Sequence, residues 1–122
     1  MTLELFFVGG SFVVGVAQMA EAWILIREQG RLSPAVAATS TVEFAWAVFC
    51  VYLLVTDRLE FARWLAIMFL AFIPVAIVVG ILADLDWFKR PSDTVRVPRS
   101  VAWLGGVFGA AYAAAALFLL AA

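Results

Sequence analysis

Histidine is absent from the 122-residue sequence, and cysteine occurs only once, as Cys50. A single thiol cannot form a disulfide within the chain, and imidazole is a usual ligand for haem, zinc and copper. We therefore expect no metal site and no cofactor, and we interpret Cys50 as a small buried hydrophobic residue. The sequence also lacks a glycine-rich phosphate loop and a nucleophile elbow, so we expect the protein not to be an enzyme.

Charged residues are scarce as well. They make up 14% of the chain, whereas about 25% is usual for a soluble domain. The formal net charge is −1, and there is no basic tail, which excludes the electrostatics of a nucleic-acid-binding protein. Hydrophobic residues make up 66% of the chain. This composition excludes a soluble globular domain and a disordered chain, and it predicts that the lipid bilayer is the main partner.

The hydrophobic residues fall into four long segments separated by short polar ones. Segments of this length span roughly 33–36 Å as helices, which is enough for a hydrocarbon core of about 30 Å. We predict an all-α membrane protein, an antiparallel four-helix transmembrane bundle that forms one domain over residues 1–122. The predicted helices cover about 3–26, 34–55, 61–83 and 101–122, and the main loop covers 84–100.

Lysine and arginine counts predict the orientation of these helices. The first and third loops, at 27–33 and 84–100, together carry six basic residues, whereas the second loop region, at 56–63, carries two. The positive-inside rule then places the first and third loops in the cytoplasm and both termini outside. The alanine-rich composition and compact loops are typical of the bacterial cytoplasmic (inner) membrane, where we place the protein.

Two carboxylates, Glu21 and Glu43, lie inside the predicted helices. An ionised group in hydrocarbon costs at least about 2–3 kcal/mol, so such residues usually face the bundle interior and serve a function. Gln18 lies three residues before Glu21, and Thr39 and Ser40 lie four and three residues before Glu43. These spacings place each carboxylate on a polar helix face. The five residues are candidates for one intramembrane ion or proton site.

Three interpretations of the carboxylates are open. In the first, Glu21 and Glu43 share a proton that a cationic substrate displaces, as in a coupled transporter. In the second, Glu43 hydrogen-bonds to hydroxyls and holds helices together, while Glu21 extends toward Arg27 or Arg31 at the interface. In the third, Glu43 meets a polar or basic group of another subunit.

Small residues recur at a spacing of four on the first and fourth predicted helices, a pattern that allows helix backbones to approach closely. They are Ser11, Gly15, Gly105, Gly109 and Ala113. Both internal packing of the bundle and an oligomer interface are consistent with this pattern. A second set with the same spacing on the fourth helix favours contacts on both of its sides.

The third predicted loop contains an aromatic and basic segment with Trp87, Lys89 and Arg90. Tryptophan is enriched at the membrane interface, and each basic residue near anionic headgroups contributes about 1 kcal/mol. We expect these three residues to contact lipid headgroups.

The sequence favours a non-enzymatic accessory, assembly or self-associating membrane subunit. The alternative is a small proton- or cation-coupled transporter or channel that acts as a homodimer through Glu43 and Glu21, because four helices alone enclose a poor pathway. Both interpretations predict a homo-oligomer or a larger membrane complex, and neither involves nucleic acid.

Overall fold

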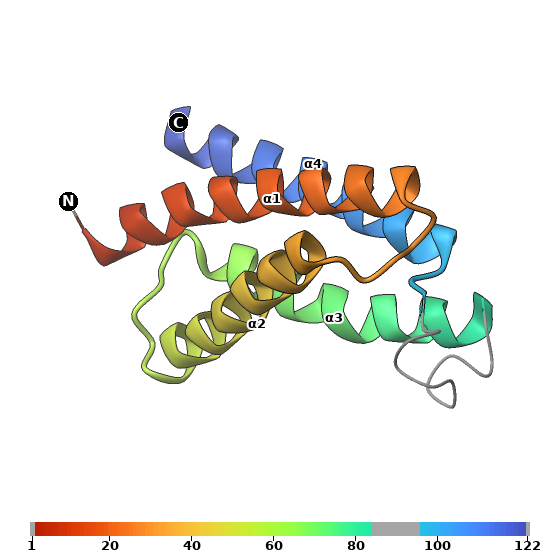
Figure 1. Ribbon diagram of the computed structural model, residues 1–122. Coiled ribbons are helices and arrows are strands. Elements are labelled where there is room, and N and C mark those ends of the chain that lie inside the picture. Colours follow the sequence, from red (N-terminus) through yellow and green to blue (C-terminus); the bar gives the residue numbers. More distant parts are fainter. Residues whose placement is uncertain (1, 84–95, 122) are drawn as a thin grey trace.

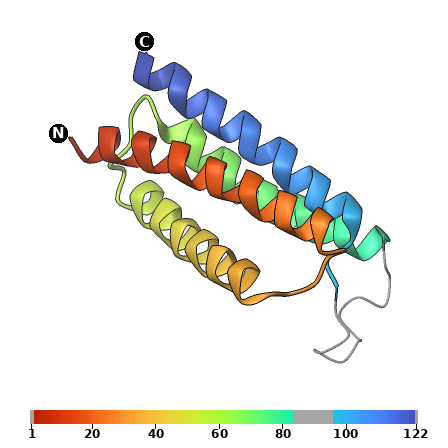
Figure 2. The same ribbon diagram turned by 45° about the horizontal axis from the view of Figure 1, so that its top comes forward.

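The computed structural model describes residues 2–83 and 96–121. Its helices are α1 (Leu3–Arg27), α2 (Pro34–Val55), α3 (Arg63–Ala83) and α4 (Arg99–Ala121). The predicted all-α four-helix fold is confirmed, and each helix is long and apolar enough to cross a membrane. The chain is therefore an integral membrane protein. The start of α1 and the end of α4 lie at the same end of the bundle, which is called the end near the termini (Figures 1 and 2).

Local sequence sets the helix ends. Ser33 caps α2 by accepting a hydrogen bond from the Val36 amide at 3.3 Å, and Pro34 occupies the first turn, where its fixed φ suits a helix. The structure begins α4 two residues earlier than the sequence predicted. The carbonyl of Pro98 accepts hydrogen bonds from the amides of Val101 and Ala102, which draws Arg99 into the helix.

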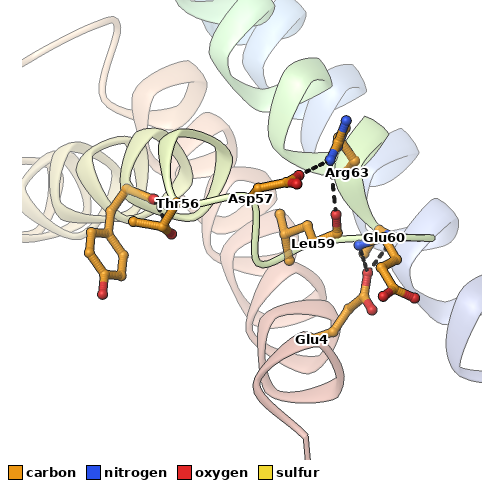
Figure 3. Close-up of polar contacts among 8 residues, drawn as sticks. Glu4, Thr56, Asp57, Leu59, Glu60 and Arg63 are labelled. Atoms are coloured by element: carbon orange, nitrogen blue, oxygen red, sulfur yellow. Dashed lines mark hydrogen bonds and ion pairs between the residues drawn. The ribbon is translucent and has the colours of Figure 1, made fainter.

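The second loop shows why α3 begins two residues later than the predicted position 61. One carboxylate oxygen of Glu4 accepts hydrogen bonds from the amides of Glu60 and Ala62, at 2.6 and 2.9 Å. These bonds hold the chain before α3 in a turn against the start of α1 (Figure 3). Arg63, the first residue of α3, forms an ion pair with Asp57 in the same loop.

At the opposite end of the bundle, the chain after α1 is joined to the chain before α4. Gly30 has a φ of +82°, a conformation that suits glycine. Its carbonyl accepts a hydrogen bond from the Val97 amide at 2.9 Å. A Cβ at Gly30 would also lie 2.3 Å from the Val97 carbonyl oxygen. Glycine is thus required both by the backbone angle and by the close approach of the two segments.

Helices α1 and α4 lie side by side and antiparallel (Figures 1 and 2), and they form the most extensive helix contact in the described chain. Gly15 and Gly109 meet at the centre of this contact. A Cβ at Gly109 would lie 2.6 Å from the Gly15 carbonyl oxygen, and a Cβ at Gly15 would lie 2.7 Å from the Gly109 carbonyl oxygen. The missing side chains allow the backbones to touch, which is the packing that small residues permit in membranes.

An aromatic cluster fills the half of the bundle near the termini and reaches the middle of the bundle at Phe72 and Phe108. Its members come from all four helices and are Phe7, Trp46, Phe49, Phe69, Phe72, Phe108 and Tyr112. The ring of Trp46 stacks on Phe7 with centroids 5.2 Å apart. It also covers Gly10, where a Cβ would lie 2.5 Å from the indole. The free thiol of Cys50 is buried in the same region.

Helix α2 is the least enclosed of the four. Only Val36, Cys50 and Leu53 are buried along its length. Its outward side chains include Phe44 and Val55, which are 72% and 78% exposed. In a bilayer these apolar residues face lipid or another protein, so α2 contributes one edge to the core and leaves the rest of its surface open.

Candidate functional site: a polar cavity in the membrane-spanning bundle

A partly open cavity of about 190 Å³ lies in the half of the bundle away from the termini. All four helices contribute to its wall, as does the segment that precedes α4. The lining residues are Gln18, Glu21, Ala22, Leu25, Leu32, Val36, Ser40, Glu43, Phe72, Ala76, Val97, Val101, Ala102 and Gly105. Four of the five polar residues that the sequence singled out are among them, and Thr39 contacts Glu21 from beside the cavity.

The structure brings the two intramembrane carboxyls together. Glu21 on α1 and Glu43 on α2 are half-buried and line the same cavity as neighbouring side chains. The antiparallel arrangement of these two helices makes them neighbours, because the last turns of α1 face the first turns of α2. Two ionised carboxylates at such close range repel each other strongly, so a single shared proton is the favourable arrangement.

The Thr39 hydroxyl links Glu21 to the first turns of α2. The Thr39 hydroxyl donates to the Val36 carbonyl at 2.9 Å and also contacts a carboxyl oxygen of Glu21. A hydroxyl has only one hydrogen to donate. The hydroxyl therefore shares this hydrogen between the Val36 carbonyl and the Glu21 carboxyl oxygen, which both accept from it.

Gln18 completes the polar end of the cavity. Its side chain lines the cavity together with Glu43, and the residue is only 5% exposed. The amide oxygen Oε1 is buried and has no hydrogen-bond partner among residues 2–83 and 96–121. A buried acceptor without a donor is uncommon in folded proteins. Ser40 also lines the cavity, although it is exposed.

Basic residues do not neutralise the carboxyls in the described part of the chain, since the cavity lining contains neither lysine nor arginine. The interpretation in which Glu21 extends toward Arg27 or Arg31 does not agree with the structure. The Arg27 guanidinium lies over the Trp23 ring, 4.8 Å from its centroid. Arg31 pairs with Glu28 at 3.2 Å. Glu21 instead points toward α2 because Thr39 offers it a hydroxyl there.

The small residues singled out in the sequence have different positions. Gly15, Gly109 and Ala113 lie in the contact between α1 and α4. Ser11 is buried and its hydroxyl lies 3.0 Å from the Tyr112 hydroxyl. Gly105 lies in the cavity wall, and a Cβ placed there would meet nothing within 4 Å. One spacing pattern therefore contains both residues that close a contact and a residue that leaves a space open.

Sequence reasoning did not find the hydrogen-bond network around Tyr112. This residue is fully buried, and its hydroxyl accepts from the Trp46 indole at 3.1 Å and contacts Ser11. A tyrosine in the middle of an apolar helix indicates a polar tip that requires partners, so the residue could have been singled out. Its partners on α1 and α2 could not, because they depend on helix rotation.

A second cavity of about 260 Å³ borders the first on the side of the Gly30–Val97 connection. The two cavities share Leu25 and Val97, and the second also contains Gln29 and Arg99. Leu25 and Val97 thus lie at the boundary between the two cavities. Trp87, Lys89 and Arg90, predicted to contact headgroups, lie outside the described residues.

Comparison of the chain with protein-family models, with curated proteins and with solved structures finds no match for any of the three.

Proposed function

We propose that this integral membrane protein exchanges a proton for a monovalent cation at the Glu21–Glu43 pair. The observation that carries the proposal is the meeting of two carboxyls from adjacent helices in one cavity whose described lining contains no basic residue. With one shared proton the pair carries a charge of −1. If a cation enters and that proton leaves for water, two carboxylates and one cation again carry −1. The exchange therefore keeps the buried charge constant, which avoids the cost of an additional charge in the bilayer.

The position of the aromatic cluster limits the path that a cation could take through the bundle. Phe7, Trp46 and Tyr112 occupy the half of the bundle between the cavity and the termini. A cation could leave toward that side only after a rearrangement of the helices or with a second copy of the chain completing the pathway. We accordingly propose a homo-oligomer in a bacterial inner membrane, with the cavity nearer to the cytoplasmic side.

Flux through proteoliposomes tests this proposal. Vesicles that contain the protein and an internal pH dye are given an inward gradient of sodium or of methylammonium, in separate experiments. We expect protein-dependent proton efflux with at least one of these cations, and we expect Glu43→Gln to abolish it because an amide cannot release the proton. Glu60→Gln is the matched control, since the exposed Glu60 contributes only its backbone amide to the described contacts.

Folding of both variants is checked by circular dichroism and by thermal unfolding in detergent. A folded Glu43→Gln variant with the same flux as the parent would contradict the proposal. Parent vesicles that are no faster than empty vesicles with either cation would contradict it as well.

One observation favours a second function, that of an accessory or assembly subunit. The outward face of α2 is unpartnered in the described chain and carries the exposed hydroxyl residue Thr41 together with apolar side chains such as Phe44. Such a face can pack against another membrane helix. Purification in mild detergent followed by mass and composition analysis tests this function. A stoichiometric second protein would support it, and a homodimer of this chain would favour the exchanger.

A further inference from the structure

The unpartnered oxygen of Gln18 identifies what the cavity lacks. Oε1 is an acceptor, it is buried, and no described residue donates to it. The neighbouring groups at the same end of the cavity are the carboxyls of Glu21 and Glu43, which also accept hydrogen bonds when ionised. A ligand that fits this end of the cavity must therefore bring hydrogen-bond donors and positive charge.

A primary ammonium group has the required donors. It carries one positive charge and three N–H groups, and it has no acceptor. Gln18 Oε1, Glu21 and Glu43 provide three acceptor groups from two adjacent helices. One N–H for each acceptor group would give the buried amide oxygen and each carboxylate a donor, and it would leave no N–H of the ammonium group unpaired.

A divalent metal ion fits these residues less well. Calcium takes six to eight oxygen ligands, and magnesium requires near-ideal octahedral geometry. The described cavity wall offers side-chain oxygens from Gln18, Glu21, Ser40 and Glu43 only. Within the described ranges, no group of three or more His, Cys, Asp or Glu residues could hold a metal ion. Sodium remains the inorganic competitor that an experiment must separate from an organic cation.

The rest of the cavity wall is apolar and indicates that the ligand also has a hydrocarbon part. Leu25, Val36, Phe72 and Val101 line it, and a Cβ placed at Gly105 would meet nothing within 4 Å. A cavity of about 190 Å³ accommodates a short aliphatic chain beside the ammonium group. Burial of that chain against these residues adds hydrophobic affinity that a bare inorganic cation cannot gain.

Building on the proposed exchange of proton for cation, we infer that the cavity binds a small primary alkylammonium ion. The ammonium group lies between Gln18 Oε1, Glu21 and Glu43, and the alkyl chain extends toward Gly105. A larger residue at position 105 would then take up space that the alkyl chain needs, because the missing side chain of Gly105 leaves open space at the cavity wall.

Calorimetric titration of the purified protein in detergent tests the donor requirement. The probes are the chlorides of butylammonium, tetramethylammonium and sodium. We expect butylammonium to bind and tetramethylammonium to bind at least about tenfold more weakly, because it has no N–H to donate to the buried acceptors. Gln18→Leu removes one acceptor, so it should weaken butylammonium binding at least about tenfold. Equal affinity for both organic cations would overturn the inference.

A pair of glycine substitutions tests the position of the alkyl chain. Gly105→Leu fills the space in the cavity and should weaken butylammonium binding at least about tenfold, with a smaller effect on methylammonium. Gly9→Leu is the matched control, because a Cβ at Gly9 also meets nothing within 4 Å but Gly9 does not line the cavity. Thermal unfolding verifies that both variants fold. A folded Gly105→Leu variant that binds butylammonium like the parent would overturn the inference.

The outcomes separate the ligand from the proposed function. If sodium binds, butylammonium does not and Glu43→Gln abolishes binding, the exchange site stands and the ligand class is wrong. If Glu43→Gln leaves both binding and proton efflux unchanged, the site and the ligand class are wrong together.

Discussion

The two halves of this bundle are built from the same four helices, yet they differ in whether their buried polar groups have hydrogen-bond partners. In the half near the termini, aromatic rings stack and the hydroxyl of Tyr112 is paired with Trp46 and Ser11. In the other half, two carboxyls share a cavity and the amide oxygen of Gln18 has no described partner. The first half conforms to the rules of a stable interior, whereas the second departs from them.

The difference assigns stability to one half and binding to the other. Unsatisfied polar groups reduce stability and are retained where they serve a function. The Glu4 contacts and the Gly15–Gly109 contact fix the positions of α1, α3 and α4. That framework holds α1 in place while α2 remains largely exposed, so the cavity can stay open without collapse of the fold.

The largest effect on the free energy of unfolding is expected when two buried leucines, one from each half, are replaced by alanine. Leu65 is fully buried in the aromatic half, and Leu25 lines the cavity. Leu65→Ala should lower the free energy of unfolding by about 2–5 kcal/mol, because it leaves a new void in a packed core. Leu25→Ala enlarges a space that is already open, so its cost should be at least about 1 kcal/mol smaller. Reversible unfolding in mixed micelles measures both, and equal costs would remove the proposed contrast.

An intermediate effect on stability is expected when two glycines of α4 are each replaced by alanine. Gly109→Ala places a methyl group 2.6 Å from the Gly15 carbonyl oxygen and should cost about 1–3 kcal/mol through overpacking. Gly105→Ala places a methyl group in open space and should increase stability by about 0.5–1 kcal/mol, because alanine favours the helix. The unfolding midpoints of the two variants should move in opposite directions. A shift in the same direction would show that the two sites do not differ as described.

The smallest effect concerns the paired hydroxyl of the aromatic half. Tyr112→Phe leaves the Trp46 indole and the Ser11 hydroxyl without their partner, and it should lower stability by about 1 kcal/mol. Butylammonium affinity should stay the same, because Tyr112 does not line the cavity. Thermal unfolding and calorimetry on one preparation measure both quantities. If the free energy of butylammonium binding falls by more than the free energy of unfolding, the two halves are energetically coupled and the contrast between them is wrong.

The sequence predicted the helices well because length and composition alone determine which segments can cross a bilayer. The predicted α2 bounds match the structure, since Ser33 and Pro34 form a start signal that depends on neighbouring residues. The predicted start of α3 was wrong by two residues. Glu4, more than fifty residues earlier in the chain, accepts hydrogen bonds from the amides of Glu60 and Ala62 and holds this segment in a turn before the helix. Contacts over such distances leave no local pattern.

The site residues could be proposed from sequence because a carboxyl in an apolar helix is costly wherever it points. Whether Glu21 and Glu43 meet could not be predicted, because a rotation of either helix by one residue would separate them. The same limit applies to the glycines. Gly105 and Gly109 belong to one spacing pattern, but only the path of α1 determines that Gly109 is covered and Gly105 is not.

Proton release on cation binding tests the central claim most directly. Butylammonium is added to the purified protein in weakly buffered detergent at neutral pH, with a pH dye as the readout. The account predicts the release of about one proton for each ammonium ion bound, and no release from a folded Glu43→Gln variant. Binding of butylammonium without proton release, or the same release from the parent and from Glu43→Gln, would contradict it.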